Sequence, residues 1–201
     1  MRQHKIKMII LVILTLNLHL FAQVTPNSSK VPPPKNPKQE IAYLAGGCFW
    51  GMEDLIRQQK GVVETEVGYM GDDKPSPTYE LIKSGRTNFA ETVKVVFDPT
   101  QTNYQKILNY FFKIHDPTTM NQQGNDKGTQ YRSAIFYTSD AQKKLAETTI
   151  KKANDMKVWK KPIVTQVSSA GLWAKAEDYH QDYLQKNPNG YTCHFERNIQ
   201  L

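Results

Sequence analysis

The chain has 201 residues, of which 39% are hydrophobic and 22% are charged, and its formal net charge is +7. This length suits a single domain with one well-filled core. Because residues 1–38 hold six lysine and arginine side chains and no acidic one, the remaining 20 basic and 19 acidic side chains nearly cancel, which argues against a nucleic-acid-binding protein.

Residues 1–22 have the layout of a secretory signal peptide. Basic side chains precede an apolar run at residues 8–21, and Ala22 follows as a small residue at the cleavage point. A membrane anchor is the alternative, but three polar residues interrupt the run, and about 20 apolar residues are needed to cross a bilayer. We therefore expect an exported protein, periplasmic or secreted, which stays tethered to the membrane if the signal is not cleaved.

Residues 23–38 are rich in proline and polar side chains and offer almost nothing to bury, so they predict a flexible linker. Residues 39–201 form the expected folded domain. Strands are expected at residues 41–45, 62–69, 91–97 and 133–137, and helices at residues 52–59 and 104–115.

This β-α-β-β-α-β order is typical of the ferredoxin-like split β-α-β arrangement, so we expect an α/β (α+β) fold, a two-layer sandwich with long loops. The pattern then predicts a helix at residues 140–155 capped by Ser139, a strand at residues 163–168 and a short helix at residues 175–185.

A cysteine lies at the first predicted strand-to-helix junction, in the run Gly47-Cys48-Phe49-Trp50-Gly51. The unpaired backbone N–H groups and the dipole of a helix N-terminus favour a thiolate over a thiol. The sequence therefore predicts a reactive nucleophile at Cys48, next to two large aromatic rings.

Glu91 begins a strand in which alternation places it on the same face as Val93, Val95 and Phe97. A carboxyl group that points into such an apolar face has a raised pKa and is a candidate general acid. The alternative is that Glu91 lies at a frayed strand end, pairs with a lysine and has no catalytic role.

The second cysteine, Cys193, lies in a turn-rich segment at residues 187–194. Two cysteines in an exported protein can form a structural disulfide or a redox pair. Both interpretations share a bond between Cys48 and Cys193, and they differ in whether an external dithiol can reduce it.

Several motifs occur together in a fixed order. They are Gly47-Cys48-Phe49-Trp50, Gly68-Tyr69, Pro77-Thr78-Tyr79, Ala90-Glu91, the run from His115 to Ile135, Ala176-Glu177-Asp178-Tyr179-His180-Gln181 and Asn187-Pro188. Over about residues 40–195 this set resembles the type A peptide methionine sulfoxide reductases.

The resemblance implies an enzyme that repairs oxidised proteins by reducing the S epimer of methionine sulfoxide, free or within proteins. Cys48 matches the family's nucleophile and Glu91 its proton donor. The polar groups around the sulfoxide oxygen match Tyr79, Asp126 and Tyr131, and the apolar wall for the substrate's methyl group matches Phe49 and Trp50.

Attack on the sulfoxide leaves the oxygen on Cys48 as a sulfenic acid, which a second thiol must then resolve. Cys193 is the only candidate for this thiol, although Thr192 separates it from the Gly-Tyr pair that directly precedes the cysteine in many family members. The implied partner is an external thioredoxin-like reductant. We expect a monomer that needs no cofactor and no metal, since the spacing of His115, His180 and His194 is not that of metal ligands.

Two other functions fit parts of this pattern. One is a cysteine hydrolase or acyltransferase that pairs Cys48 with a histidine such as His180. The other is a secreted binding module held together by a structural disulfide.

Overall fold

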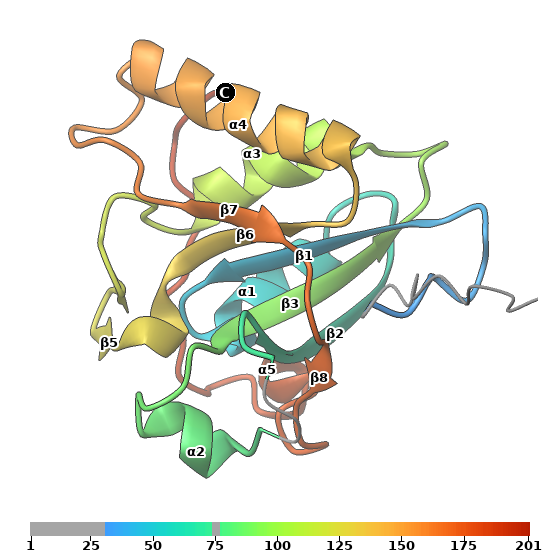
Figure 1. The fold of residues 1–201 in the computed structure, drawn as a ribbon, viewed down its shortest axis with the longest axis vertical. Coiled ribbons are helices and arrows are strands. Elements are labelled where there is room, and N and C mark those ends of the chain that lie inside the picture. Colours follow the sequence, from blue (N-terminus) through green and yellow to red (C-terminus); the bar gives the residue numbers. More distant parts are fainter. Residues whose placement is uncertain (1–30, 74–76) are drawn as a thin grey trace, which may run out of the picture.

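The computed structural model describes residues 31–73 and 77–201 (Figure 1). The predicted signal peptide and the first part of the predicted linker lie outside these residues. Within the described ranges, no helix has both the length and the apolar character needed to cross a bilayer.

Six strands form one mixed sheet in the order β7-β6-β1-β3-β2-β8. They are β1 (Glu40–Gly46), β2 (Val62–Met70), β3 (Ala90–Phe97), β6 (Ser133–Tyr137), β7 (Gln166–Ser169) and β8 (Ala174–Lys175). β1 runs antiparallel to both β3 and β6, β3 runs antiparallel to β2, and only β7 is added in parallel. The four strands β6-β1-β3-β2 have the ferredoxin-like order, so the predicted fold class is confirmed.

Five α-helices connect and flank these strands. They are α1 (Phe49–Arg57), α2 (Tyr79–Lys83), α3 (Tyr104–Ile114), α4 (Asp140–Asp155) and α5 (Tyr183–Lys186). The N-caps Asn103 of α3 and Ser139 of α4 each accept a hydrogen bond from a backbone N–H in the first turn. The predicted cap of α4 is therefore confirmed.

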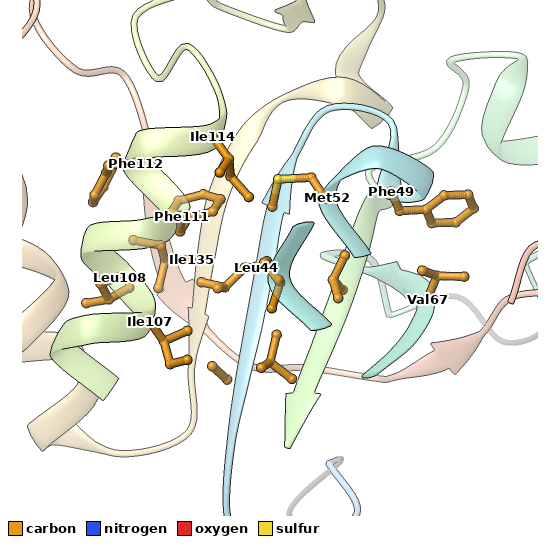
Figure 2. Packing of buried hydrophobic residues seen from close by; sticks show 14 of the residues in the cluster. Leu44, Phe49, Met52, Val67, Ile107, Leu108, Phe111, Phe112, Ile114 and Ile135 are labelled. Carbon is orange, nitrogen blue, oxygen red and sulfur yellow. The ribbon is translucent and has the colours of Figure 1, made fainter. Parts of the chain in front are cut away.

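The main core lies between one face of the sheet and helices α1, α3 and α4. α3 contributes residues at a helical spacing, from Ile107 and Leu108 to Phe111 and Phe112, and these belong to the same buried cluster as Leu44 of β1 (Figure 2). Val93, Val95 and Phe97 of β3 join the same cluster, as the alternation pattern predicts. The opposite face is also buried, around Tyr43 and Phe136, beneath Trp173 and Ala170.

Two sequence predictions of local structure are wrong. The predicted helix at residues 175–185 is mostly turns that follow Lys175 of β8, and only Tyr183–Lys186 is helical, because Asp182 before it has a left-handed backbone with φ of 54°. The strand predicted at residues 163–168 begins later, at Gln166. Between α3 and β6, where the sequence predicts no regular element, the chain forms the hairpin β4 (Gln122–Gln123) and β5 (Asp126–Lys127) and a 3-10 turn at Thr129–Tyr131.

α1 begins three residues earlier than predicted, so Cys48 is its N-cap. The chain turns from β1 into α1 at Gly47, whose φ is 107°. A Cβ atom at Gly47 would lie 2.5 Å from the side chain of Gln123. The turn therefore requires glycine for both its backbone angle and its contact with the hairpin loop.

Gly47→Ala should destabilise the protein by about 1–3 kcal/mol, because it combines backbone strain with this steric overlap. Urea denaturation measures the change. Gly85→Ala is the matched control, because Gly85 also has positive φ, 69°, but a Cβ there meets no atom within 4 Å. Its cost should be only about 1 kcal/mol. Equal losses for the two variants would contradict the proposed contact with Gln123.

Candidate active site

Cys48 lies between the end of β1 and the start of α1, beside the start of β3. Its side chain is 6% exposed, and it forms no disulfide. The backbone N–H of Trp50 lowers the pKa of its thiol, but the side chain makes no capping hydrogen bond to the helix. Cys48 thus lies at a helix N-terminus, as predicted, but in a poorly hydrated position.

Glu91 is the second residue of β3, paired with Tyr69 on β2. Its side chain is 3% exposed, so the prediction that it points inward is confirmed. Its Oε2 atom accepts a hydrogen bond of 3.1 Å from the backbone N–H of Phe49, the first residue of α1. This bond places the carboxyl group at the same helix end as Cys48.

Burial determines the protonation state of both groups. It raises the pKa of Glu91 from 4.5 to about 8, against the opposing effect of the Phe49 N–H. Burial also raises the pKa of the Cys48 thiol well above its usual range. The second cause is the negative charge that Glu91 carries when it is ionised. The prediction that the helix N-terminus favours a thiolate at Cys48 is therefore wrong, because the nearby N–H of Trp50 does not offset desolvation.

A small cavity of about 120 Å³ opens onto these two groups. It is lined by every predicted substrate-binding residue, and by Tyr191 in addition: Cys48, Phe49, Trp50, Tyr79, Glu91, Asp126, Tyr131 and Tyr191. Burial raises the pKa of Tyr79 to about 12 and also raises that of Tyr131. Both hydroxyl groups therefore remain protonated and are able to donate hydrogen bonds into the cavity.

Two contacts fix the side chain of Trp50. Its indole Nε1–H donates to Nδ1 of His180 at 3.1 Å, and its ring stacks on Tyr183 with the ring centroids 3.8 Å apart. The ring of Phe49 lies against His180 as well, at 5.1 Å. Because Nδ1 of His180 accepts from Trp50, it is not available as a base for Cys48, which disfavours the hydrolase alternative.

Glu177 is a positioning residue that sequence reasoning missed. Its carboxylate accepts the backbone N–H of Tyr79 and the hydroxyl of Tyr69, each at 2.9 Å. These two bonds tie the start of α2 to β2 and so set the position of Tyr79. The motif that contains Tyr179 and His180 indicated that this segment belongs to the family pattern, but the sequence did not show which groups bind the Glu177 carboxylate.

Cys193 lies next to the cavity, half-buried and free. Its Sγ atom is 3.3 Å from Oδ2 of Asp126, which also accepts the Tyr191 hydroxyl at 3.1 Å. The backbone N–H of Cys48 lies close enough to the Cys193 sulfur to lower the pKa of that thiol. The structure therefore brings the two cysteines together as neighbouring thiols.

In the part of the chain that the structure describes, no group of three or more metal-ligating side chains is present. His115 is fully buried, with Nδ1 at 2.6 Å from the carbonyl oxygen of Phe111 and Nε2 at 2.8 Å from the hydroxyl of Ser133. Burial lowers its pKa to about 3, so it stays neutral in the core. These contacts give His115 a structural role in the core.

Comparison with known proteins identifies close relatives. A family model described as "Peptide methionine sulfoxide reductase" matches residues 40–201. The curated "Peptide methionine sulfoxide reductase MsrA" of Mycolicibacterium paratuberculosis is 54% identical over 156 residues, which cover 78% of this chain and 89% of that protein.

Solved structures agree with this result. Mxr1 from Saccharomyces cerevisiae in reduced form has a TM-score of 0.76 at 37% identity, covering 85% of this chain and 98% of that one. Methionine sulfoxide reductase A of Corynebacterium diphtheriae has a TM-score of 0.70 at 38% identity, covering 83% and 84%. Mxr1 has also been solved in complex with Trx2, where the match has a TM-score of 0.57 at 23% identity and covers 85% and 97%.

Replacing Glu91 should change how stability depends on pH. In the unfolded chain the Glu91 carboxyl ionises above its ordinary pKa of 4.5, whereas in the folded protein it keeps its proton up to about pH 8. Stability therefore falls as pH rises between these values, by about 1.4 kcal/mol for each unit of pKa difference. Glu91→Gln removes this ionisation and keeps an oxygen for the Phe49 N–H.

Urea denaturation at pH 5 and pH 9 tests the prediction. Relative to the wild type, Glu91→Gln should gain a few kcal/mol between the two pH values. Glu80→Gln, which changes an exposed carboxyl on α2, is the control and should show no such gain. A Glu91→Gln variant whose stability follows the wild type at both pH values would show that this carboxyl is not neutral in the folded protein.

Proposed function

The chain belongs to the type A peptide methionine sulfoxide reductase family and reduces methionine (S)-sulfoxide to methionine, and we propose that Cys48 and Glu91 carry out this reaction. The observation that supports this assignment is the single hydrogen bond from Phe49 to Glu91, which places a neutral carboxyl beside the only thiol on the cavity wall.

The chemistry requires an acid because an unprotonated sulfoxide oxygen is a poor leaving group. Glu91 protonates this oxygen while Tyr79 and Tyr131 donate hydrogen bonds to it. The Cys48 sulfur attacks the substrate sulfur, and the hydroxyl formed on the substrate sulfur then passes to the Cys48 sulfur as its bond to the substrate sulfur breaks. Cys48 is oxidised to a sulfenic acid, the substrate sulfur is reduced to a thioether, and the thiol proton of Cys48 replaces the proton that Glu91 gave.

Recognition of the substrate uses the other wall of the cavity. Phe49 and Trp50 present ring surfaces that suit a methyl group bonded to sulfur. With the methyl group on this wall and the oxygen at Glu91, only one epimer directs its remaining substituent out of the cavity. This three-point arrangement supports selectivity for the S epimer.

Regeneration uses Cys193. Its contact with the Cys48 backbone supports condensation with the sulfenic acid to give a disulfide and water. Because Cys193 is more exposed than Cys48, an external dithiol reaches the bond from the Cys193 side. The complex of the yeast relative Mxr1 with Trx2 supports a thioredoxin-like protein as this reductant.

We infer that residues 39–201 are exported. The inference rests on the signal-peptide pattern of residues 1–22 and on the proline-rich linker at residues 23–38. The repair reaction would then serve proteins oxidised in the periplasm or outside the cell.

An assay with the separated epimers tests the activity. The full chain, with excess dithiothreitol, should form methionine from the S epimer and none from the R epimer. Cys48→Ser should abolish the reaction, because a hydroxyl does not form the sulfenic acid. Cys193→Ser, with the same loss of one thiol, is the matched control and should retain dithiothreitol-driven turnover. Equal turnover of both epimers, or activity in Cys48→Ser, would refute the assignment.

Mass spectrometry of the protein from an exporting bacterial host tests the first 22 residues. The mature chain should lack them and begin near Gln23. An intact N-terminus on protein recovered from the membrane fraction would show that the segment is an anchor instead.

A further inference from the structure

The segment that carries Cys193 is docked directly on the start of α1. A Cβ atom on Gly51 would lie 2.2 Å from the Thr192 hydroxyl and 2.8 Å from Nδ1 of His194. The absence of a side chain at Gly51 therefore lets residues 192–194 approach the helix backbone. The Thr192 hydroxyl also accepts the backbone N–H of His194 at 3.1 Å, which fixes the turn around Cys193.

His194 is held in one tautomer by this docking. Its Nε2 atom is 2.8 Å from the carbonyl oxygen of Gly46, at the end of β1. A carbonyl oxygen only accepts hydrogen bonds, so Nε2 must carry the proton and Nδ1 must carry a lone pair. Nδ1 lies 3.5 Å from the sulfur of Cys193. The basic nitrogen of the ring thus points to the resolving thiol.

Asp126, His194 and Tyr191 all face the Cys193 thiol. Asp126 and His194 have opposite effects on a thiolate at Cys193. A carboxylate beside the sulfur repels the developing negative charge, whereas an imidazole that takes the proton becomes positive and stabilises it. Burial, together with the hydrogen bond and charge of Asp126, raises the pKa of Cys193 to about 12, so the thiol needs a base in order to attack.

We propose that His194 is a catalytic residue of the second half-reaction and accepts the proton of Cys193 as this thiol attacks the Cys48 sulfenic acid. The inference rests on the proposed role of Cys193. The new bond joins the two sulfurs, and the S–O bond of the sulfenic acid breaks. The hydroxyl takes a proton from Glu91, which lines the same cavity, and leaves as water, and the proton that His194 receives from Cys193 balances this transfer.

The surroundings of His194 suit this role. The ring is 6% exposed, and burial lowers its pKa to about 4, so at neutral pH the lone pair on Nδ1 is free to accept. The thiol and the imidazole rest as a neutral pair. The proton moves only as the S–S bond forms, which protects Cys193 from other oxidants between turnovers.

His194→Gln tests the proposal because the glutamine amide can still donate to the Gly46 carbonyl but offers no basic nitrogen to Cys193. The full chain is mixed with one equivalent of methionine (S)-sulfoxide and no reductant. Release of one equivalent of methionine shows that the Cys48 site is intact. Dimedone trapping of the sulfenic acid and mass spectrometry of the Cys48–Cys193 disulfide then give the rate of the second step.

We expect His194→Gln to accumulate the sulfenic acid and to form the disulfide about a hundredfold more slowly than the wild type. Glu196→Gln, in the same segment as His194, removes the charge that pairs with Lys113 of α3; it is the control and should resolve at the wild-type rate. A wild-type rate in His194→Gln would overturn the proposal. Slow resolution in both variants would also overturn it, because loosening of the segment would then explain the effect.

A measurement on the wild type does not depend on any variant. The ¹⁵N shifts of His194 should show a neutral ring protonated at Nε2, and a ring protonated at Nδ1 would exclude it as the base. Failure of the proposed role of Cys193 gives a different result from failure of the proposal about His194. If the wild type and Cys193→Ser both stop at the sulfenic acid, Cys193 does not resolve Cys48 at all, and the inference about His194 is refuted together with that role.

Discussion

The hydrogen bond from the Phe49 backbone to the Glu91 carboxyl joins the two elements on which the site depends. It connects the second residue of β3 to the first residue of α1, and so sets the acid beside the thiol that caps the helix. The helix end attracts negative charge, but burial outweighs this attraction and keeps Glu91 protonated. The site therefore stores a proton where the reaction needs one.

The turn from β1 into α1 serves both half-reactions from opposite sides. Its Phe49 N–H holds the acid of the first step, while its Gly46 carbonyl orients the His194 ring for the second. Gly47 and Gly51 allow the hairpin loop and the Cys193 segment to pack closely on this turn. The two cysteines are consequently close before any oxidation occurs, so the sulfenic acid forms next to the thiol that removes it.

Much of the fold and the site was predictable because it depends on local periodicity and on motifs. The alternation in β3 identified the buried face of Glu91, and the ordered motifs identified the residues that line the cavity. The protonation of Cys48 was not predictable, because desolvation depends on how many atoms surround the sulfur in three dimensions. The orientation of the His194 ring toward Cys193 was not predictable either, because the Gly46 carbonyl that sets it is 148 positions away in sequence. The segment at residues 175–185 looked helical, but its glutamate and glutamine side chains bond to β2 and α2 instead.

The protonation state of Glu91 tests the account most directly. A ¹³C NMR titration of the side-chain carboxyls, with Glu91→Gln for assignment, follows this group in the free enzyme. The account predicts one carboxyl that titrates near pH 8 and is missing in the variant. A Glu91 carboxyl that titrates near 4.5, like an exposed one, would contradict it, because the cavity would then hold no proton for the sulfoxide oxygen.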